Sequence, residues 1–182
     1  MPSGPSTAER RPLRSVAIKG IDQVKRDADS EGMDRARLSA SGHGHPKDSR
    51  FAWYFLRGPA VNPDEVSQLT GMTPDTAWHV GDPKPRTGIP HTVGFWSVDS
   101  GLTPSDEFHE HLDALLERLR PSWSTFVALG QRFGAGVDSA IYLREAQGPL
   151  VQLLPDVAAA LSELNATLGF DLYALVEEST ET

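Results

Sequence analysis

The sequence predicts an α+β domain in which helices pack mainly on one face of a largely antiparallel sheet. Four apolar runs of strand length, rich in aromatic and β-branched residues, alternate with segments whose apolar residues have helical spacing. The order is strand, helix, strand, two helices, strand, helix, strand. The two halves also resemble each other, which favours a ferredoxin-like, pseudo-duplicated arrangement of four strands or slightly more.

Residues 1–50 differ in composition from the rest of the 182-residue chain. Every Phe, Trp and Tyr lies at or after Phe51. The apolar residues of the "SVAIKGIDQVK" stretch (Val16, Ile18, Ile21 and Val24) are too sparse to fold alone. We therefore expect a disordered polar leader and linker over residues 1–50, and a single α+β domain over residues 51–182.

The first two elements of the domain have clear boundaries. "FAWYFLRG" has the length of a strand and large side chains at both alternating sets of positions, which indicates a central strand. In "NPDEVSQLTG", Asn62 is placed to cap a short helix, Pro63 occupies its first position, and Gly71 is placed to end it.

A second strand and two helices follow. In "GFWSVDS", Phe95 and Ser97 point to one face of the strand, and Trp96 and Val98 to the other. "TPSDEFHEHLDALLERLRP" is predicted as a long amphipathic helix that ends before Pro121. "SWSTFVALGQRFG" predicts another helix, from a cap at Ser122 to a stop at Gly134.

The last third of the domain repeats the pattern of strand, helix and strand. "VDSAIYLRE" and "FDLYALVEE" are the predicted strands, and "LPDVAAALSELNATLG" the helix, with Leu168 on its apolar stripe and Gly169 as its end. Trp53, Trp96 and Trp123 are expected to fill the core.

Charge and composition exclude several classes of function. Residues 1–50 carry ten Lys/Arg against seven Asp/Glu, so seven of the 17 basic and 18 of the 25 acidic residues remain for the domain. An acidic domain repels phosphate backbones, so we do not expect nucleic-acid binding. The chain has no cysteine, no signal-peptide core and no apolar run long enough for a membrane helix. We expect a soluble, cytoplasmic protein.

Five segments occur in a distinctive order: the aromatic strand, "NPDEVSQLTGMTPDTAWHVGDPKPRTG", "GFWSVDS", "HLDALLERLRP" and "GFDLYALVE". With them, about residues 51–178 resemble a bacterial family, the domain-of-unknown-function family numbered 4279. The resemblance implies a common fold and a bacterial origin. It implies no reaction and no catalytic residues, because the family has none established.

The stretch "WHVGDPKPRTGIPHTVGFWSVDS", residues 78–100, holds the candidate functional residues. As a binding site it offers Trp78, Lys84, Arg86 and His91; if the protein is an enzyme, the candidates are His79, Asp82, His91 and Asp99. The histidines lack the spacing of a metal motif, so neither a metal nor another cofactor is expected. We expect Trp78 to hold the loop against the sheet, with Lys84, Arg86 and His91 displayed.

These observations favour a protein that acts by binding, with a protein partner in a regulatory or immunity-like role. The acidic domain would steer a basic partner. A small hydrolase-like enzyme and a small-ligand-binding module remain the alternatives, both using the loop. The enzyme requires the four enzymatic candidates to converge in a cleft. The small-ligand-binding module requires an apolar cavity between sheet and helices. The oligomeric state does not follow from the sequence.

Overall fold

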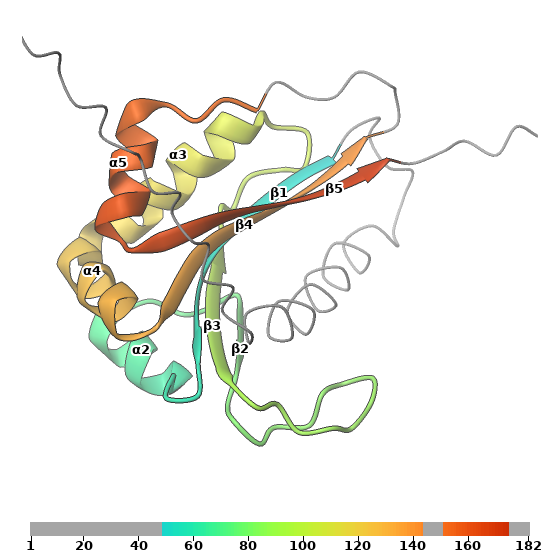
Figure 1. Ribbon diagram of the computed structural model, residues 1–182, viewed down its shortest axis with the longest axis vertical. Helices are drawn as coiled ribbons and strands as arrows, with labels where there is room; N and C mark the ends of the chain where they lie inside the picture. The colour runs from blue at the N-terminus through green and yellow to red at the C-terminus, as the bar shows by residue number, and fades with distance from the viewer. Residues whose placement is uncertain (1–48, 144–150, 175–182) are drawn as a thin grey trace, which may run out of the picture.

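The computed structural model describes residues 49–143 and 151–174, which form one five-stranded sheet with helices on one side (Figure 1). The strands lie in the order β2-β3-β1-β4-β5. Their bounds are β1 (Ser49–Gly58), β2 (Thr76–Trp78), β3 (Gly94–Asp99), β4 (Gly134–Leu143) and β5 (Ala166–Ala174). β1 is central, as its two-sided apolar pattern predicts, and is antiparallel to both β3 and β4.

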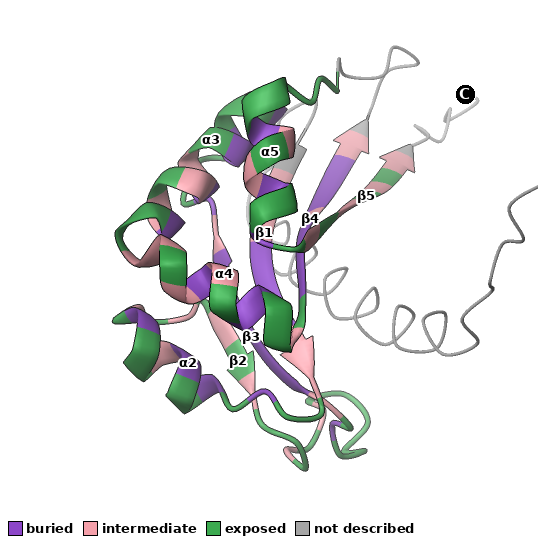
Figure 2. Ribbon diagram, turned by 60° about the vertical axis from the view of Figure 1, so that its left-hand side comes forward, coloured by how far each residue is buried: buried purple, intermediate pink, exposed green. Residues whose placement is uncertain are grey.

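The helices among the described residues pack against the same face of the sheet (Figure 2). They are α2 (Pro63–Thr70), α3 (Phe108–Leu119), α4 (Trp123–Arg132) and α5 (Pro155–Glu163), with the short 3₁₀ turn η1 (Arg120–Ser122) before α4. Alternate residues of the strands meet them in the core, which includes Tyr54, Leu56, Trp96, Val98, Val137, Ile141, Phe108, Leu115, Phe126 and Leu161.

Helix α2 has the ends that the sequence predicts. The Asn62 side chain accepts a hydrogen bond from the Asp64 backbone N–H (3.0 Å), which satisfies one of the free donors of the first turn. Gly71 ends the helix with φ 69°, a left-handed conformation that glycine adopts without steric cost.

One predicted helix needs correction, and one strand was not predicted. The predicted helix through Leu168 to Gly169 ends earlier, because α5 stops at Glu163 and Asn165 takes a positive φ of 52° that turns the chain into β5. Leu168 still packs against the core, but from a strand, and Gly169 lies inside β5 beneath the Asp138 side chain. The three-residue strand β2 is too short to be seen in the sequence pattern.

The pseudo-duplicated, ferredoxin-like arrangement is not confirmed. The two halves of the sheet are connected differently: β1 and β3 are antiparallel neighbours, whereas β4 and β5 are parallel and joined through α5. The four-stranded antiparallel sheet of the prediction is therefore a mixed sheet of five strands, with three antiparallel pairings and one parallel pairing.

The face of the sheet that turns away from the helices is rich in aromatic residues, and we call it the aromatic face. Strand register places on it Phe51, Trp53, Phe55, Arg57, Thr76, Trp78, Phe95, Ser97, Asp99, Gly136, Asp138, Ala140, Tyr142, Thr167, Gly169, Asp171 and Tyr173. Within residues 49–143 and 151–174, no helix lies over this face (Figure 2).

Candidate functional site

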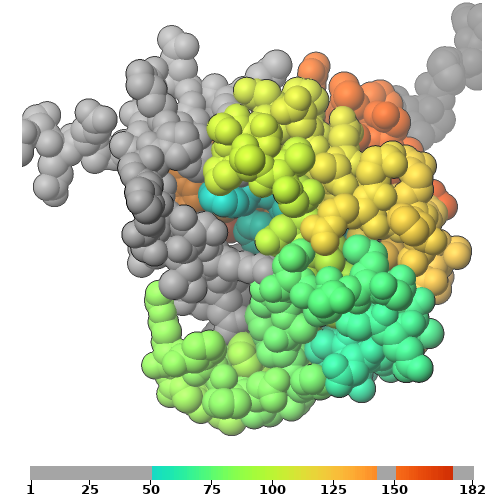
Figure 3. Space-filling view, turned by 180° about the vertical axis from the view of Figure 1, so that it is seen from behind, coloured from blue at the N-terminus to red at the C-terminus, as the bar shows by residue number. Residues whose placement is uncertain are grey.

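The connection between β2 and β3, residues 79–93, is an extended hairpin loop that projects from the end of the sheet (Figures 1 and 3). Its two arms are joined by backbone hydrogen bonds: Gly81 N–H to His91 C=O (2.9 Å), His91 N–H to Asp82 C=O (2.8 Å) and Lys84 N–H to Ile89 C=O (2.9 Å). The hairpin loop is therefore an ordered, paired structure along most of its length.

Trp78 anchors the base of the hairpin loop on the aromatic face. Its indole stacks on the Phe95 ring (centroids 4.2 Å apart) and on the His91 ring (4.5 Å). The indole Nε1 also donates a hydrogen bond to the Val93 carbonyl (3.1 Å). Phe55 extends the stack across β1, with its ring centroid 5.8 Å from that of Phe95. One aromatic side chain, at the start of the first arm, thus contacts the second arm of the loop and the sheet beneath.

His79 and Asp82 close a tight turn in the first arm. The Asp82 carboxylate accepts a hydrogen bond from the His79 backbone N–H (2.7 Å), and this bond is the main cause that lowers the pKa of Asp82. The His79 Nε2 lies 3.1 Å from an oxygen of Asp64, a residue of α2. These contacts connect the loop to α2.

His91 is buried, which corrects the expectation that it is displayed on the loop. It is 6% exposed, under the Trp78 indole. Burial is the largest cause that lowers the pKa of its imidazole, and nearby Lys84 lowers it further, against the opposing effect of Asp82. The neutral ring therefore packs as an aromatic group that supports the base of the loop.

The outer part of the hairpin loop is exposed and partly apolar. In this outer part, residues 83–90, Ile89 is 60% exposed and Arg86 is exposed at the tip; Val80, 50% exposed, lies nearer the base. Lys84 is half-buried. Pro83, Pro85 and Pro90 restrict the backbone between them. The tip therefore combines an exposed aliphatic side chain with basic groups on a restrained backbone.

Asp99 does not join the other enzymatic candidates. It lies at the opposite end of β3 from the loop, where its backbone N–H donates to Asp75 Oδ2 (2.8 Å) and its carbonyl accepts from the Arg118 guanidinium. Residues 49–143 and 151–174 contain no group of three or more His, Asp or Glu side chains placed to hold a metal ion. The structure thus brings together His79, Asp82 and His91, but not Asp99.

Comparison with known proteins identifies the family. The model of a family described as "Domain of unknown function (DUF4279)" matches residues 49–175 of the 182. The chain belongs to the DUF4279 family. No curated protein and no solved structure matches it significantly. None of the helices described in this DUF4279 domain is long and apolar enough to cross a membrane.

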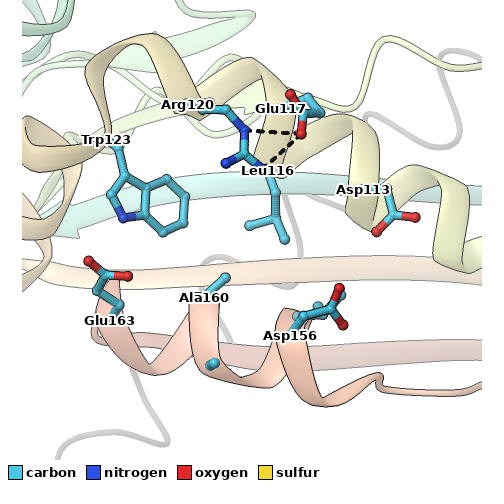
Figure 4. Close-up of a pocket in the computed structure, with 10 residues that line it drawn as sticks. Asp113, Leu116, Glu117, Arg120, Trp123, Asp156, Ala160 and Glu163 are labelled. Atoms are coloured by element: carbon cyan, nitrogen blue, oxygen red, sulfur yellow. Dashed lines mark hydrogen bonds and ion pairs between the residues drawn. The ribbon is translucent and has the colours of Figure 1, made fainter.

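The DUF4279 domain also has a groove on its helical side, with a volume of about 840 Å³ (Figure 4). It lies between α3 and α5, with Leu116, Val157 and Ala160 as its apolar part and Trp123 at one end. Asp113, Glu117, Asp156 and Glu163 surround it; Arg120 donates to Glu117 Oε1 from Nε (3.0 Å) and Nη2 (2.8 Å). This groove is separated from the hairpin loop by the body of the domain.

Several residues that hold or line the loop of this DUF4279 domain were missed by sequence reasoning. Phe55 and Phe95 belong to the Trp78 stack, and Asp64 contacts His79, although they come from β1, β3 and α2. No local pattern predicts such contacts across the fold. Val80 and Ile89 could have been noticed as aliphatic residues among turn-forming ones.

Proposed function

We propose that the protein acts by binding another protein and that the tip of the hairpin loop makes the contact. The observation that carries this proposal is the contrast between the two ends of the loop. The base is fixed by the Trp78 stack, whereas Arg86 and Ile89 at the outer part are exposed. A preorganised loop loses little conformational entropy on binding, and exposed aliphatic groups gain by burial.

The alternatives receive less support from the same residues. A hydrolase-like site needs an acid or base beside an exposed reacting position, yet His91 is buried under Trp78 and Asp99 lies at the far end of β3. A small-ligand module in the loop would need an enclosing cavity. The groove of about 840 Å³ lies instead between two helices and has carboxylates around it.

The charge of the domain favours a partner with a basic surface around an acidic or apolar patch. The 18 Asp/Glu and seven Lys/Arg after residue 50 favour approach of a basic protein, while Lys84 and Arg86 suit an acidic group at the centre of the contact. We include in the proposal the bacterial, cytoplasmic setting and the regulatory or immunity-like role that the sequence suggests.

The test is a quantitative capture experiment with the full chain as bait. Proteins retained by the parent are compared with those retained by the Lys84→Ala/Arg86→Ala variant and by an Ile89→Asp variant. An Arg120→Ala/Arg132→Ala variant is the matched control, because it removes the same charge from the helical side. A true partner is lost at least about tenfold with both loop variants, which corresponds to about 1.4 kcal/mol of binding free energy.

The control variant should retain that partner, and all variants should have the melting temperature of the parent. A partner retained equally by both loop variants would show that the hairpin loop is not the binding site. If the control variant lost the partner to the same extent as the loop variants, the retention would be non-specific and electrostatic.

A further inference from the structure

The aromatic face has large and small side chains that are buried although no described helix lies over them. Phe55 and Phe95 are each 7% exposed, Ala140 is 2% exposed, and Ser97 is fully buried. Their burial extends across β1, β3 and β4. A sheet with one face in water has polar residues on that face, whereas this one has aromatic residues on both. Such a face is normally packed against a further layer of the protein.

The aromatic face is also negatively charged. Among the residues that register places on it, Asp99, Asp138 and Asp171 are acidic and Arg57 is basic. Two glycines flatten it near its centre: the Phe55 ring lies over Gly136, and the Asp138 carboxylate lies over Gly169. An occupant that carries apolar side chains for the aromatic rings, and basic ones for the net negative charge, would therefore complement this face.

One segment of this chain, residues 14–26 ("RSVAIKGIDQVKR"), has that composition. Its aliphatic residues are Val16, Ile18, Ile21 and Val24, and it carries Arg14, Lys19, Lys25 and Arg26 against a single acid, Asp22. Residues 27–48 connect it to β1, which is the central strand of the sheet. These 22 residues span at most ~75 Å when extended, so the connection easily reaches every part of the face.

We propose that residues 14–26 bind across the aromatic face of the same chain, with the aliphatic side chains on the aromatic rings and the basic side chains beside Asp99, Asp138 and Asp171. A segment too sparse in apolar residues to fold alone becomes ordered when it finds such a face. This inference concerns a different surface from the hairpin tip and does not rest on the proposed function.

The absence of cysteine from the chain allows a direct test with single-cysteine variants of the full-length protein. Ala140→Cys places a small thiol on the aromatic face, Ala135→Cys places one in the core under the helices (5% exposed), and Ala159→Cys places one on the exposed surface of α5. The rate of reaction with a thiol reagent is measured for each. The Ala140→Cys thiol should react at least about tenfold more slowly than the Ala159→Cys thiol, because reaction requires local release of the segment.

The same three variants are then combined with Ile18→Asp/Ile21→Asp, which removes two aliphatic contacts and adds negative charge. Ala140→Cys should now react at least about tenfold faster, while Ala135→Cys stays slow. The matched control is Ser39→Asp/Ala40→Asp, which adds the same charge outside the segment and should leave the Ala140→Cys rate unchanged.

Fast reaction of Ala140→Cys in the otherwise unchanged chain would overturn the proposal, because nothing would then cover the face. So would slow reaction that persists with Ile18→Asp/Ile21→Asp, since neighbouring side chains alone would explain the burial. If the Ala135→Cys thiol also reacts faster, a second measurement decides: disulfide formation between Gln23→Cys and either Thr167→Cys or Tyr173→Cys. A disulfide with either position supports the proposal, and the absence of a disulfide with each of them overturns it.

Discussion

At the scale of single residues, Trp78 has the largest expected effect on the hairpin loop. Trp78→Ala removes the stack on His91 and Phe95 and the bond to Val93, and should lower the free energy of unfolding by about 2–3 kcal/mol, less than for a fully buried Trp. Hydrogen exchange should accelerate at residues 79–93. Chemical denaturation and exchange followed by mass spectrometry measure the two effects.

Trp78→Phe is the matched control for this prediction. It keeps a ring in the stack but loses the Nε1 donor, so about 1 kcal/mol should be lost and the loop should stay largely protected. Unchanged stability and protection in the Trp78→Ala variant would show that the paired backbone arms hold the loop without the indole.

Tyr54 gives a prediction about pH. Its side chain is fully buried, its hydroxyl has no hydrogen-bond partner among the described residues, and burial raises the pKa of the phenol well above its usual value near 10. Above about pH 10 the unfolded chain therefore loses a proton that the folded chain retains. The contribution to stability is complete below pH 10 and is lost as pH rises, by up to about 1.4 kcal/mol per pH unit.

Tyr54→Phe should remove this alkaline loss while changing stability near pH 7 by no more than about 1 kcal/mol, since no hydrogen bond is broken. Denaturant unfolding at pH 9 and pH 11 compares it with the parent and with Tyr142→Phe, whose side chain is only partly buried. An identical alkaline slope in the parent and the Tyr54→Phe variant would contradict the burial argument.

At the scale of elements, α4 meets the junction of α5 and β5 through backbone contact. A Cβ at Gly130 would collide with the Leu164 carbonyl oxygen, and the Asn165 side chain donates to the Gly130 carbonyl (2.9 Å). The absence of a side chain at Gly130 thus sets how closely the helix approaches the point where the chain leaves α5.

Gly130→Ala should therefore lower the free energy of unfolding by about 1–3 kcal/mol, although alanine is intrinsically the better helix former by about 1 kcal/mol. Ser124→Ala, an exposed change in the same helix, is the control and should stay within about 0.5 kcal/mol of the parent. Thermal unfolding checks both, and a stabilised Gly130→Ala variant would show that α4 moves away at little cost.

At the scale of the whole molecule, local patterns predicted the elements that have strong ends or long apolar periods. The cap at Asn62, the stop at Gly71 and the apolar stripe of α3 are properties of short stretches, and each element forms where expected. The prediction that the last helix continues through Leu168 was wrong, because the apolar spacing continues past Asn165, where the backbone turns into a strand. Periodicity does not distinguish a core residue of a helix from one of an adjoining strand.

The candidate site was predictable only in part, for the same reason. Turn-forming residues indicated the loop, and Trp78 indicated its anchor, but the burial of His91 depends on its stacking with Trp78, which in turn stacks on Phe95, and on the opposite arm of the loop. The separation of Asp99 from His79 follows from the direction of β3. Such relations arise from strand pairing, which one sequence does not specify.

The central place of β1 has a consequence for synthesis on the ribosome. β1 is the first described strand in chain order, yet its neighbour β4 begins 76 positions after β1 ends, at Gly134. At typical elongation rates, ~4–15 s separate the two. During that time the nascent chain carries an aromatic strand that lacks one of its final neighbours. Such a strand is prone to pair with other chains, so β1 is the segment that a chaperone would need to protect during translation.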